Sequence, residues 1–305
     1  MKKIIILILA LFSSDIVSAQ QDPQFSQNMF NKLANNPGFA GSRGLIATSI
    51  LHRSQWMGFG DDGAAISTQN FSIDAELPSL YGGVGLNIVK DNIAQFSNLG
   101  VQASYAYRTE LGLGQIGMGM SVGIFQSGLD GAALRPSTAG DPFIPDVDVN
   151  GSALDIGAGI YYNTQDVYIG ISSSHMTEPT IAWNDNTEFN LKRHYFLISG
   201  YYYQINPILS LNPSIYLKSD GATSQLDINS NVIYNDRFWG GVSYRLDEGV
   251  IMLAGMDITE DLRFGIAYDI TMVNSMGNSL EIMLGYNFKI DTSKPVSKHK
   301  NPRFL

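Results

Sequence analysis

The sequence contains no cysteine, few charged residues and no long apolar run, and each shortage excludes a class of protein. Without cysteine the chain forms no disulfide-stapled fold, thiol active site or cysteine zinc site, and it has no lipidated cysteine anchor. Charged residues make up 15% of the 305 residues, compared with about 25% in soluble domains. A mean hydropathy of −0.01, without runs of about 20 apolar residues, argues against a bundle of membrane-spanning helices.

The chain is instead rich in glycine and tyrosine and is acidic overall. It has 31 glycines, 15 tyrosines and a formal net charge of −9. A protein with this charge is repelled by phosphate backbones, so we expect no nucleic-acid partner.

Residues 1–19 have the pattern of a secretory signal peptide. Lys2 and Lys3 precede the apolar run Ile4 to Phe12, and the small-residue site Val17-Ser18-Ala19 follows. Nine apolar residues are too few to cross about 30 Å of hydrocarbon, which argues against a membrane anchor. The sequence therefore predicts export and cleavage before Gln20.

From about residue 44 onward, apolar and polar residues alternate, which is typical of strands with two different faces. In residues 262–270, one face carries only apolar side chains, and the other carries Arg263, Gly265, Ala267 and Asp269. About fourteen such segments occur, near residues 44–54, 66–76, 82–91, 97–108, 114–127, 152–163, 166–174, 192–203, 207–218, 224–234, 237–245, 249–256, 261–270 and 279–289.

This count and the lengths of the connections predict an all-β fold, a transmembrane antiparallel up-and-down β-barrel over residues 44–290. Barrels of the outer membrane have an even number of strands, short periplasmic turns and longer outer loops. Here every second connection is short, and most of the others are long, notably residues 56–65, 128–151 and 175–191. We therefore expect an integral protein of the outer membrane, in contact with its lipid.

A soluble two-sheet sandwich also has alternating strands and is the main alternative fold. Strands of about ten residues favour the barrel, because they match the nine to eleven residues of a tilted transmembrane strand. Aromatic residues near strand ends would form the interfacial girdle of a membrane barrel. They are Tyr81, Tyr107, Tyr161, Tyr162, Tyr201 to Tyr203, Tyr234, Trp239 and Tyr286.

No pattern in the sequence predicts catalysis, a cofactor or a metal site, so the protein is not expected to be an enzyme. The four histidines have no spacing typical of metal ligands. Residues 146–151 copy the first half of a calcium-binding loop, but Gly157 stands where the loop requires a bidentate glutamate. A solvated acidic loop explains these residues better.

Residues 20–43 and 291–305 lack the strand pattern, and the first of these segments carries a family resemblance. The motifs are Gln21-Asp22-Pro23-Gln24-Phe25-Ser26-Gln27, Met29-Phe30, Asn36-Pro37-Gly38-Phe39-Ala40-Gly41-Ser42, Arg53-Ser54-Gln55-Trp56-Met57-Gly58 and the closing Asn301-Pro302-Arg303-Phe304-Leu305. With these motifs the chain resembles the PorP/SprF family of outer-membrane proteins of the type IX secretion system of Bacteroidetes. The similarity is strong over residues 20–60 and weaker across the strands.

The resemblance implies a barrel that works with the type IX machinery, including its periplasmic ring proteins. It also implies a role in secretion or cell-surface attachment of large cargo proteins such as gliding adhesins. The runner-up function is an outer-membrane porin or hydrophobic-solute transporter, because about fourteen strands can enclose a lumen.

Two roles remain open for residues 20–43, as a lumenal plug or as a periplasmic docking segment. Its aromatic and apolar side chains would pack in either setting, while asparagine and glutamine amides would bond a polar wall. Trp56 marks either the membrane interface or a cargo contact, and we expect both chain ends in the periplasm or the lumen. The residues of this partner or plug motif are Asp22, Pro23, Gln24, Phe25, Gln27, Met29, Phe30, Asn36, Pro37, Gly41, Arg53, Gln55 and Trp56.

Overall fold

The computed structural model describes residues 22–57, 66–134, 144–184, 187–273 and 277–288. The predicted signal peptide and C-terminal tail lie outside the described residues. Helical structure in the described part consists of single turns, α2 (Lys32–Asn35), η1 (Pro37–Phe39) and η2 (Pro78–Leu80). The strands are β1 (Ile46–Met57), β2 (Ile66–Leu77), β3 (Gly82–Ile93), β4 (Phe96–Leu111), β5 (Gly114–Leu129), β6 (Val149–Asn163), β7 (Val167–Ser174), β8 (Thr180–Ala182), β9 (Glu188–Asn190), β10 (His194–Tyr201), β11 (Tyr203–Asn206), β12 (Leu209–Ser219), β13 (Ser224–Tyr234), β14 (Phe238–Arg245), β15 (Gly249–Asp257), β16 (Leu262–Thr271) and β17 (Asn278–Phe288).

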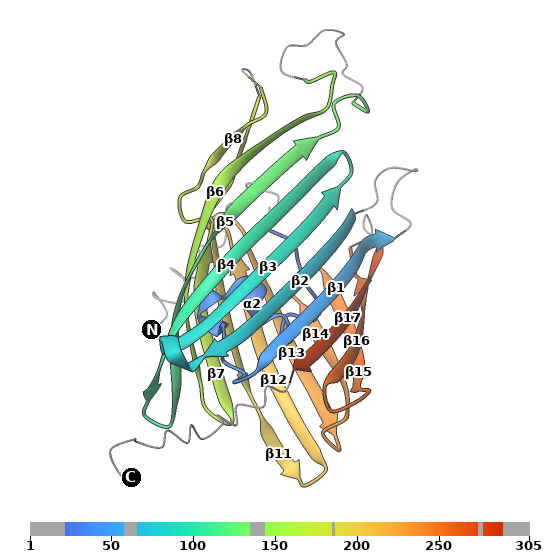
Figure 1. Cartoon of the computed structure of the whole chain (residues 1–305). Coiled ribbons are helices and arrows are strands. Elements are labelled where there is room, and N and C mark those ends of the chain that lie inside the picture. The colour runs from blue at the N-terminus through green and yellow to red at the C-terminus, as the bar shows by residue number, and fades with distance from the viewer. Residues whose placement is uncertain (1–21, 58–65, 135–143, 185–186, 274–276, 289–305) are drawn as a thin grey trace, which may run out of the picture.

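The strands close into one antiparallel barrel (Figure 1). Neighbours in sequence pair with each other, and β1 pairs with β17 to close the ring. Both β10 and β11 pair with β12, so these two short strands together act as one barrel strand that is interrupted at Tyr202. Counted in this way, the barrel has fourteen strands.

Fourteen strands and the up-and-down order confirm the fold predicted from the alternation. The predicted strand ends lie within about three residues of the observed ones. The sequence did not predict the small separate sheet of β8 and β9 inside the long connection after β7. Trp183, which follows β8, stacks on Phe189 of β9 and donates a hydrogen bond to the Ser127 carbonyl oxygen over 3.0 Å. These contacts fix β8 and β9 beside the end of β5.

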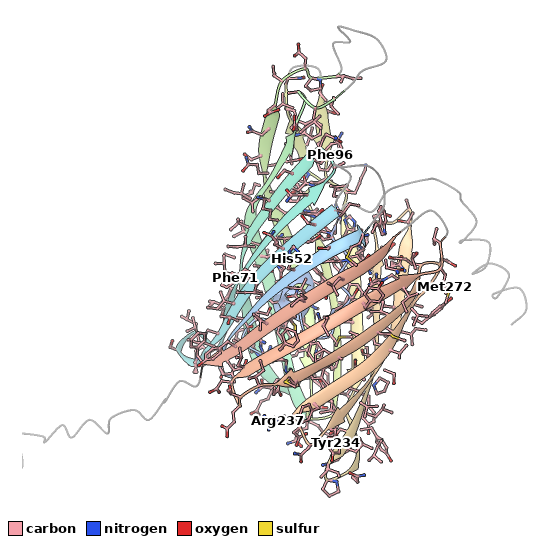
Figure 2. The ribbon with its side chains drawn as sticks, turned by 90° about the vertical axis from the view of Figure 1, so that its right-hand side faces the viewer. His52, Phe71, Phe96, Tyr234, Arg237 and Met272 are labelled. Carbon is pink, nitrogen blue, oxygen red and sulfur yellow. The ribbon has the colours of Figure 1, made fainter. Side chains whose placement is uncertain are left out.

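The polarity of the two faces of the sheet is the reverse of that in a soluble protein, with apolar side chains outside and polar side chains inside. On β16, Tyr268 and Ile270 are exposed, while Ala267 and Asp269, which alternate with them, are buried in the lumen. Figure 2 shows side chains standing off the outside of the strands, with Met272 at the barrel margin, where it is 66% exposed. A sheet that is apolar outside and polar inside satisfies its backbone by closing and offers its apolar face to lipid.

Three of the aromatic residues assigned to the interfacial girdle are instead inside the barrel. Tyr161 and Trp239 are 3% and 6% exposed and pack in the lumen, and Tyr202 lines the cavities beside Phe30. Their prediction as girdle residues was wrong, because nearness to a strand end does not tell which face a side chain takes. Tyr81, Tyr107, Tyr201 and Tyr234 are exposed.

The two ends of the barrel differ in the length of their connections. One end, called here the short-turn end, carries connections such as η2 and the two residues between β4 and β5. The opposite end, the long-loop end, carries the connections after β1, β5 and β7, and β4, β5 and β6 extend furthest there (Figure 1). In the described part of the chain, no helix has the length and apolarity needed to cross a membrane.

Candidate functional site

Residues 22–43, called here the lumenal segment, lie inside the barrel. Figure 1 shows α2 enclosed by the strands. Most of its side chains are buried, and Ser26 and Gln27 are completely so. The segment begins near the long-loop end, runs through the lumen and joins β1 at the short-turn end.

The first part of the lumenal segment, residues 22–28, is held by a carboxylate on β17. The two oxygens of Glu281 accept hydrogen bonds from the backbone N–H groups of Ser26 and Gln27 over 2.7 and 2.8 Å. The Ser26 hydroxyl lies 2.7 Å from one oxygen of Asp269 and 2.6 Å from a guanidinium nitrogen of Arg53. All four side chains around this turn are buried, so the backbone donors have protein partners in place of water.

Two buried arginines balance the carboxylates of this cluster. Arg53 lies 2.7 Å from Asp269 and 3.5 Å from Glu281. Arg245 forms a two-pronged pair with Asp227 at 3.0 and 3.1 Å and also lies 3.2 Å from Asp269. Asp227 is within 3.3 Å of the Asn28 amide, so the lumenal segment again joins the network. Charges buried at this depth persist only when they are paired.

The second part of the lumenal segment, residues 29–41, fits against a group of glycines on the barrel wall, called here the glycine wall. A Cβ on Gly119 would lie 2.4 Å from the Pro37 carbonyl carbon, and a Cβ on Gly117 would lie 2.3 Å from the Gly38 carbonyl oxygen. Gly41 has a φ of +73°, and a Cβ on this residue would lie 2.7 Å from the Gly83 Cα. Only hydrogen at these wall positions leaves room for the backbone of the segment.

Asn36 and Lys32 complete this contact. The Asn36 side chain accepts a hydrogen bond from Gly38 N over 2.8 Å and donates to the Ile160 carbonyl over 3.0 Å. Lys32 places its ammonium 3.5 Å from the centre of the Tyr168 ring. Burial, together with the nearby charge of Arg43, lowers the pKa of Lys32 to about 7. The second part is thus fixed by shape and aromatic contacts more than by ion pairs.

A different cluster lies at the beginning of the lumenal segment. His175 bonds Asp22 through Nε2 at 2.8 Å and Asp155 through Nδ1 at 2.9 Å, and His194 Nδ1 lies 3.8 Å from Asp22. Burial alone would lower the pKa of His175, but the charge of Asp22 and the two hydrogen bonds raise it to about 10. Lys218 donates a hydrogen bond to the Asp22 carbonyl oxygen over 2.9 Å.

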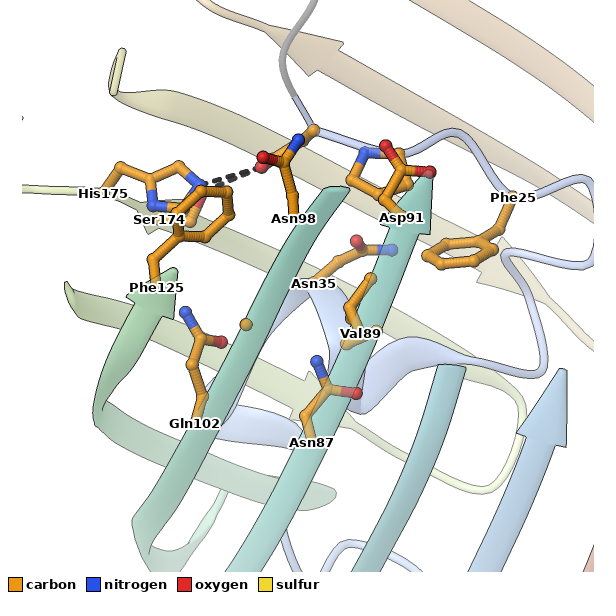
Figure 3. Close-up of a pocket in the computed structure, with 14 residues that line it drawn as sticks. Phe25, Asn35, Asn87, Val89, Asp91, Asn98, Gln102, Phe125, Ser174 and His175 are labelled. Atoms are coloured by element: carbon orange, nitrogen blue, oxygen red, sulfur yellow. Dashed lines mark hydrogen bonds and ion pairs between the residues drawn. The ribbon is translucent and has the colours of Figure 1, made fainter. Parts of the chain in front are cut away.

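Cavities remain on both sides of the lumenal segment. The cavity at the long-loop end has a volume of about 620 Å³, and Asp22, Pro23 and Gln24 form part of its wall. At the short-turn end, cavities of about 230 and 240 Å³ share Met29 and Phe30. A smaller cavity beside His175 lies between the segment and β3 to β5 (Figure 3).

The structure places every residue of the sequence-predicted motif in or beside the lumen. Phe25, Gln27, Met29, Asn36, Pro37, Gly41 and Arg53 are buried. Phe30 packs on Trp239 with ring centroids 4.5 Å apart. Asp22, Pro23, Gln24, Gln55 and Trp56 line the cavity at the long-loop end.

Sequence reasoning missed the wall residues that receive the segment. Arg245, Asp269, Glu281 and His175 were not predicted as site residues. The available signal was a charge on the polar face of a strand, which Asp269 and Glu281 show, but their partners lie 243 and 255 residues away.

Comparison with known proteins finds one family and several barrels. A family model described as type IX secretion system membrane protein PorP/SprF matches residues 17–286. The toluene transporter TbuX of Ralstonia pickettii is 13% identical, with 83% of this chain and 92% of that chain covered and a TM-score of 0.50. The toluene transporter TodX of P. putida and a FadL homologue of Pseudomonas aeruginosa are each 13% identical, with TM-scores of 0.48. For TodX the match covers 85% of this chain and 94% of that chain, and for the FadL homologue 80% and 90%. At these identities the likeness concerns the fold alone. A search among curated proteins gives no match.

Proposed function

The chain belongs to the family of type IX secretion system membrane proteins PorP/SprF, and from this membership we propose that it supports secretion or cell-surface attachment of specific cargo proteins, such as gliding adhesins. The observation that carries the proposal is the family match over residues 17–286, which spans the lumenal segment and nearly the whole barrel. A barrel whose lumen already contains part of its own chain suits an accessory role better than free diffusion.

The two ends of the barrel receive different partners in this proposal. Short turns face the periplasm in outer-membrane barrels, so the short-turn end meets the periplasmic ring proteins of the machinery. The cavities there expose Phe30, Arg43 and Arg263, which offer aromatic and cationic groups to such a partner. Export through a signal peptide cleaved after Ala19 precedes insertion of the barrel.

The long-loop end meets the cargo. Loops on a rigid scaffold are where binding residues collect, and the connections predicted near residues 128–151 and 175–191 run from β5 to β6 and from β7 to β10. Replacing residues 175–191 with a short Gly/Ser turn should abolish cargo display while the barrel still inserts. The same replacement at residues 246–248, a short connection at the same end, is the control. Normal display with the 175–191 replacement would contradict this assignment.

The direct test of the proposed function is a clean deletion in the native host, complemented in trans. Surface and secreted proteins are then compared by quantitative mass spectrometry. We expect one or a few large proteins to disappear from the surface and to return on complementation. An unchanged surface proteome would contradict the proposal.

A porin or hydrophobic-solute transporter is the alternative, and conductance separates the two. Because the lumenal segment contributes to the cavities at both ends, we expect no steady current through the purified protein in planar bilayers. A stable open channel in every insertion would favour the transporter.

A further inference from the structure

Three side chains with metal-binding atoms converge at the beginning of the lumenal segment, and we propose that they bind a divalent transition-metal ion, Zn²⁺ by their ligand chemistry. They are Asp22 of the segment, His175 after β7 and His194 at the start of β10. One ligand atom from each lies within 4.8 Å of the other two. Two imidazoles and a carboxylate are a typical three-residue ligand set for zinc. The proposal does not depend on the secretion function.

The second ring nitrogen of each histidine already has the partner that a metal ligand requires. His175 Nδ1 lies 2.9 Å from an Asp155 oxygen, and His194 Nδ1 lies 2.9 Å from the Lys192 carbonyl oxygen. A metal-bound histidine almost always donates its other N–H to a carboxylate or a backbone carbonyl, which fixes its tautomer. With Nδ1 engaged in this way, Nε2 is the nitrogen of each histidine that would bind the metal. At His175 this atom now lies 2.8 Å from an Asp22 oxygen, so metal binding would release its proton and replace that contact.

An unsatisfied nitrogen points to a missing ligand. His194 is fully buried, and its Nε2 has no hydrogen-bond partner among the described residues. A buried polar atom without a partner is costly and requires an explanation. An ion pair between Asp22 and His175 accounts for the His175 nitrogens but leaves His194 Nε2 unexplained. A metal ion would satisfy both histidines.

The space and the charges around the three ligands fit a metal ion. Ligand atoms on a tetrahedral zinc lie about 3.3 Å apart, and one atom from each residue already lies within 4.8 Å of the other two. The His194 nitrogen near Asp22 is Nδ1, at 3.8 Å, so the His194 ring must reorient to bring Nε2 to the ion. The cavity beside Asp22 and His175 gives room for a water as fourth ligand (Figure 3). Lys218 donates a hydrogen bond to the Asp22 carbonyl oxygen and not to its carboxylate, and the Asp155 carboxylate beside His175 adds negative charge near the ion.

Such an ion would join the first residue of the described lumenal segment to the wall at two points. The two wall ligands flank the connection between β7 and β10 at the long-loop end, His175 at its start and His194 as the first residue of β10, and this connection also carries the β8–β9 hairpin. Metal binding would therefore fix the beginning of the segment and the base of this long connection together.

The test uses the mature chain, purified without a polyhistidine tag and stripped with a chelator, titrated with Zn²⁺ and with Co²⁺ as a spectroscopic probe. We expect one equivalent to bind and the Co²⁺ absorption bands of a four- or five-coordinate site to appear. His194→Gln should weaken binding by at least about 100-fold, and Asp155→Asn by about 10–100-fold. His52→Gln, at an exposed position on the outer face, should bind like the wild type.

The wild-type protein alone keeps the test decisive if a variant fails to fold. Zn²⁺, but not Mg²⁺, should raise its unfolding temperature and slow amide exchange in residues 174–176 and 194–196. Absence of stoichiometric binding, or equal binding by a folded His194→Gln variant, would overturn the proposal.

Discussion

The two parts of the lumenal segment are held in the barrel by different forces. The charge-held part, residues 22–28, bonds to Glu281, Asp269 and Asp227 and to the arginines that pair with them. The shape-held part, residues 29–41, packs against Trp239 and the glycine wall. In the charge-held part a single wall residue makes several hydrogen bonds or ion pairs. In the shape-held part the stabilisation is distributed over many van der Waals contacts. The two parts should therefore respond to different substitutions.

The largest effect is expected from Arg53→Ala. This arginine contacts Ser26, Asp269 and Glu281, and its loss leaves two buried carboxylates short of a partner. Breaking a buried ion pair costs about 3–5 kcal/mol. The loss should appear in the free energy of unfolding, to be measured by urea titration in lipid vesicles. Amide exchange should increase first in the charge-held part.

Arg237→Ala is the matched control, because Arg237 is exposed at the short-turn end. Its unfolding free energy should stay within about 0.5 kcal/mol of the wild type. Equal losses in the two variants would mean that the buried network contributes nothing specific.

A smaller effect, confined to the shape-held part, is expected from Gly119→Ala. The added methyl would lie 2.4 Å from the Pro37 carbonyl carbon, so the backbone of the segment must move. Overpacking of this kind costs about 1–3 kcal/mol. Amide exchange measured by mass spectrometry should rise in residues 29–41 and stay unchanged in residues 26–28.

Gly100→Ala serves as its control, since a Cβ there meets its nearest atom, on Phe125, at 3.7 Å. That separation is ordinary van der Waals contact, and exchange should match the wild type. If Gly119→Ala also leaves exchange unchanged, the glycine wall does not hold the segment.

The smallest effect is expected from Lys32→Met. Lys32 is buried against Tyr168 and Tyr161. Removing its charge relieves the cost of burial and loses the cation–π contact, so the two changes offset each other. The unfolding free energy should change by less than about 1 kcal/mol. A loss above about 2 kcal/mol would show that charge matters in the shape-held part too.

The strands were readable from the sequence, whereas the pairing across the lumen was not. Alternation of apolar and polar residues depends only on neighbours, so segments such as β16 were predicted nearly to the residue. The bond between Ser26 and Asp269 joins positions 243 residues apart and leaves no trace in local spacing. Asp22 and His175 are 153 residues apart, which is why the scattered histidines gave no metal-site pattern.

From the sequence, the location of the lumenal segment could be narrowed to the lumen or the periplasm, but the sequence could not decide between them. Its amides and aromatics suit a polar lumen and a periplasmic partner equally. What selects the lumen is the wall itself, through glycines such as Gly117 and Gly119 and through Glu281. These residues read as ordinary members of polar strand faces until the barrel closes.

Amide exchange of the wild-type barrel in lipid nanodiscs tests the central claim most directly, because the lumenal segment has its own set of bonded amides. Ser26, Gln27, Gly38 and Gly41 donate to side-chain oxygens, and Phe30, Asn36, Phe39 and Ala40 donate to carbonyls. We predict exchange in residues 26–41 that is slowed to a degree approaching that of β5. Exchange at the rate of an unfolded peptide across these residues, with the strands still protected, would contradict the account.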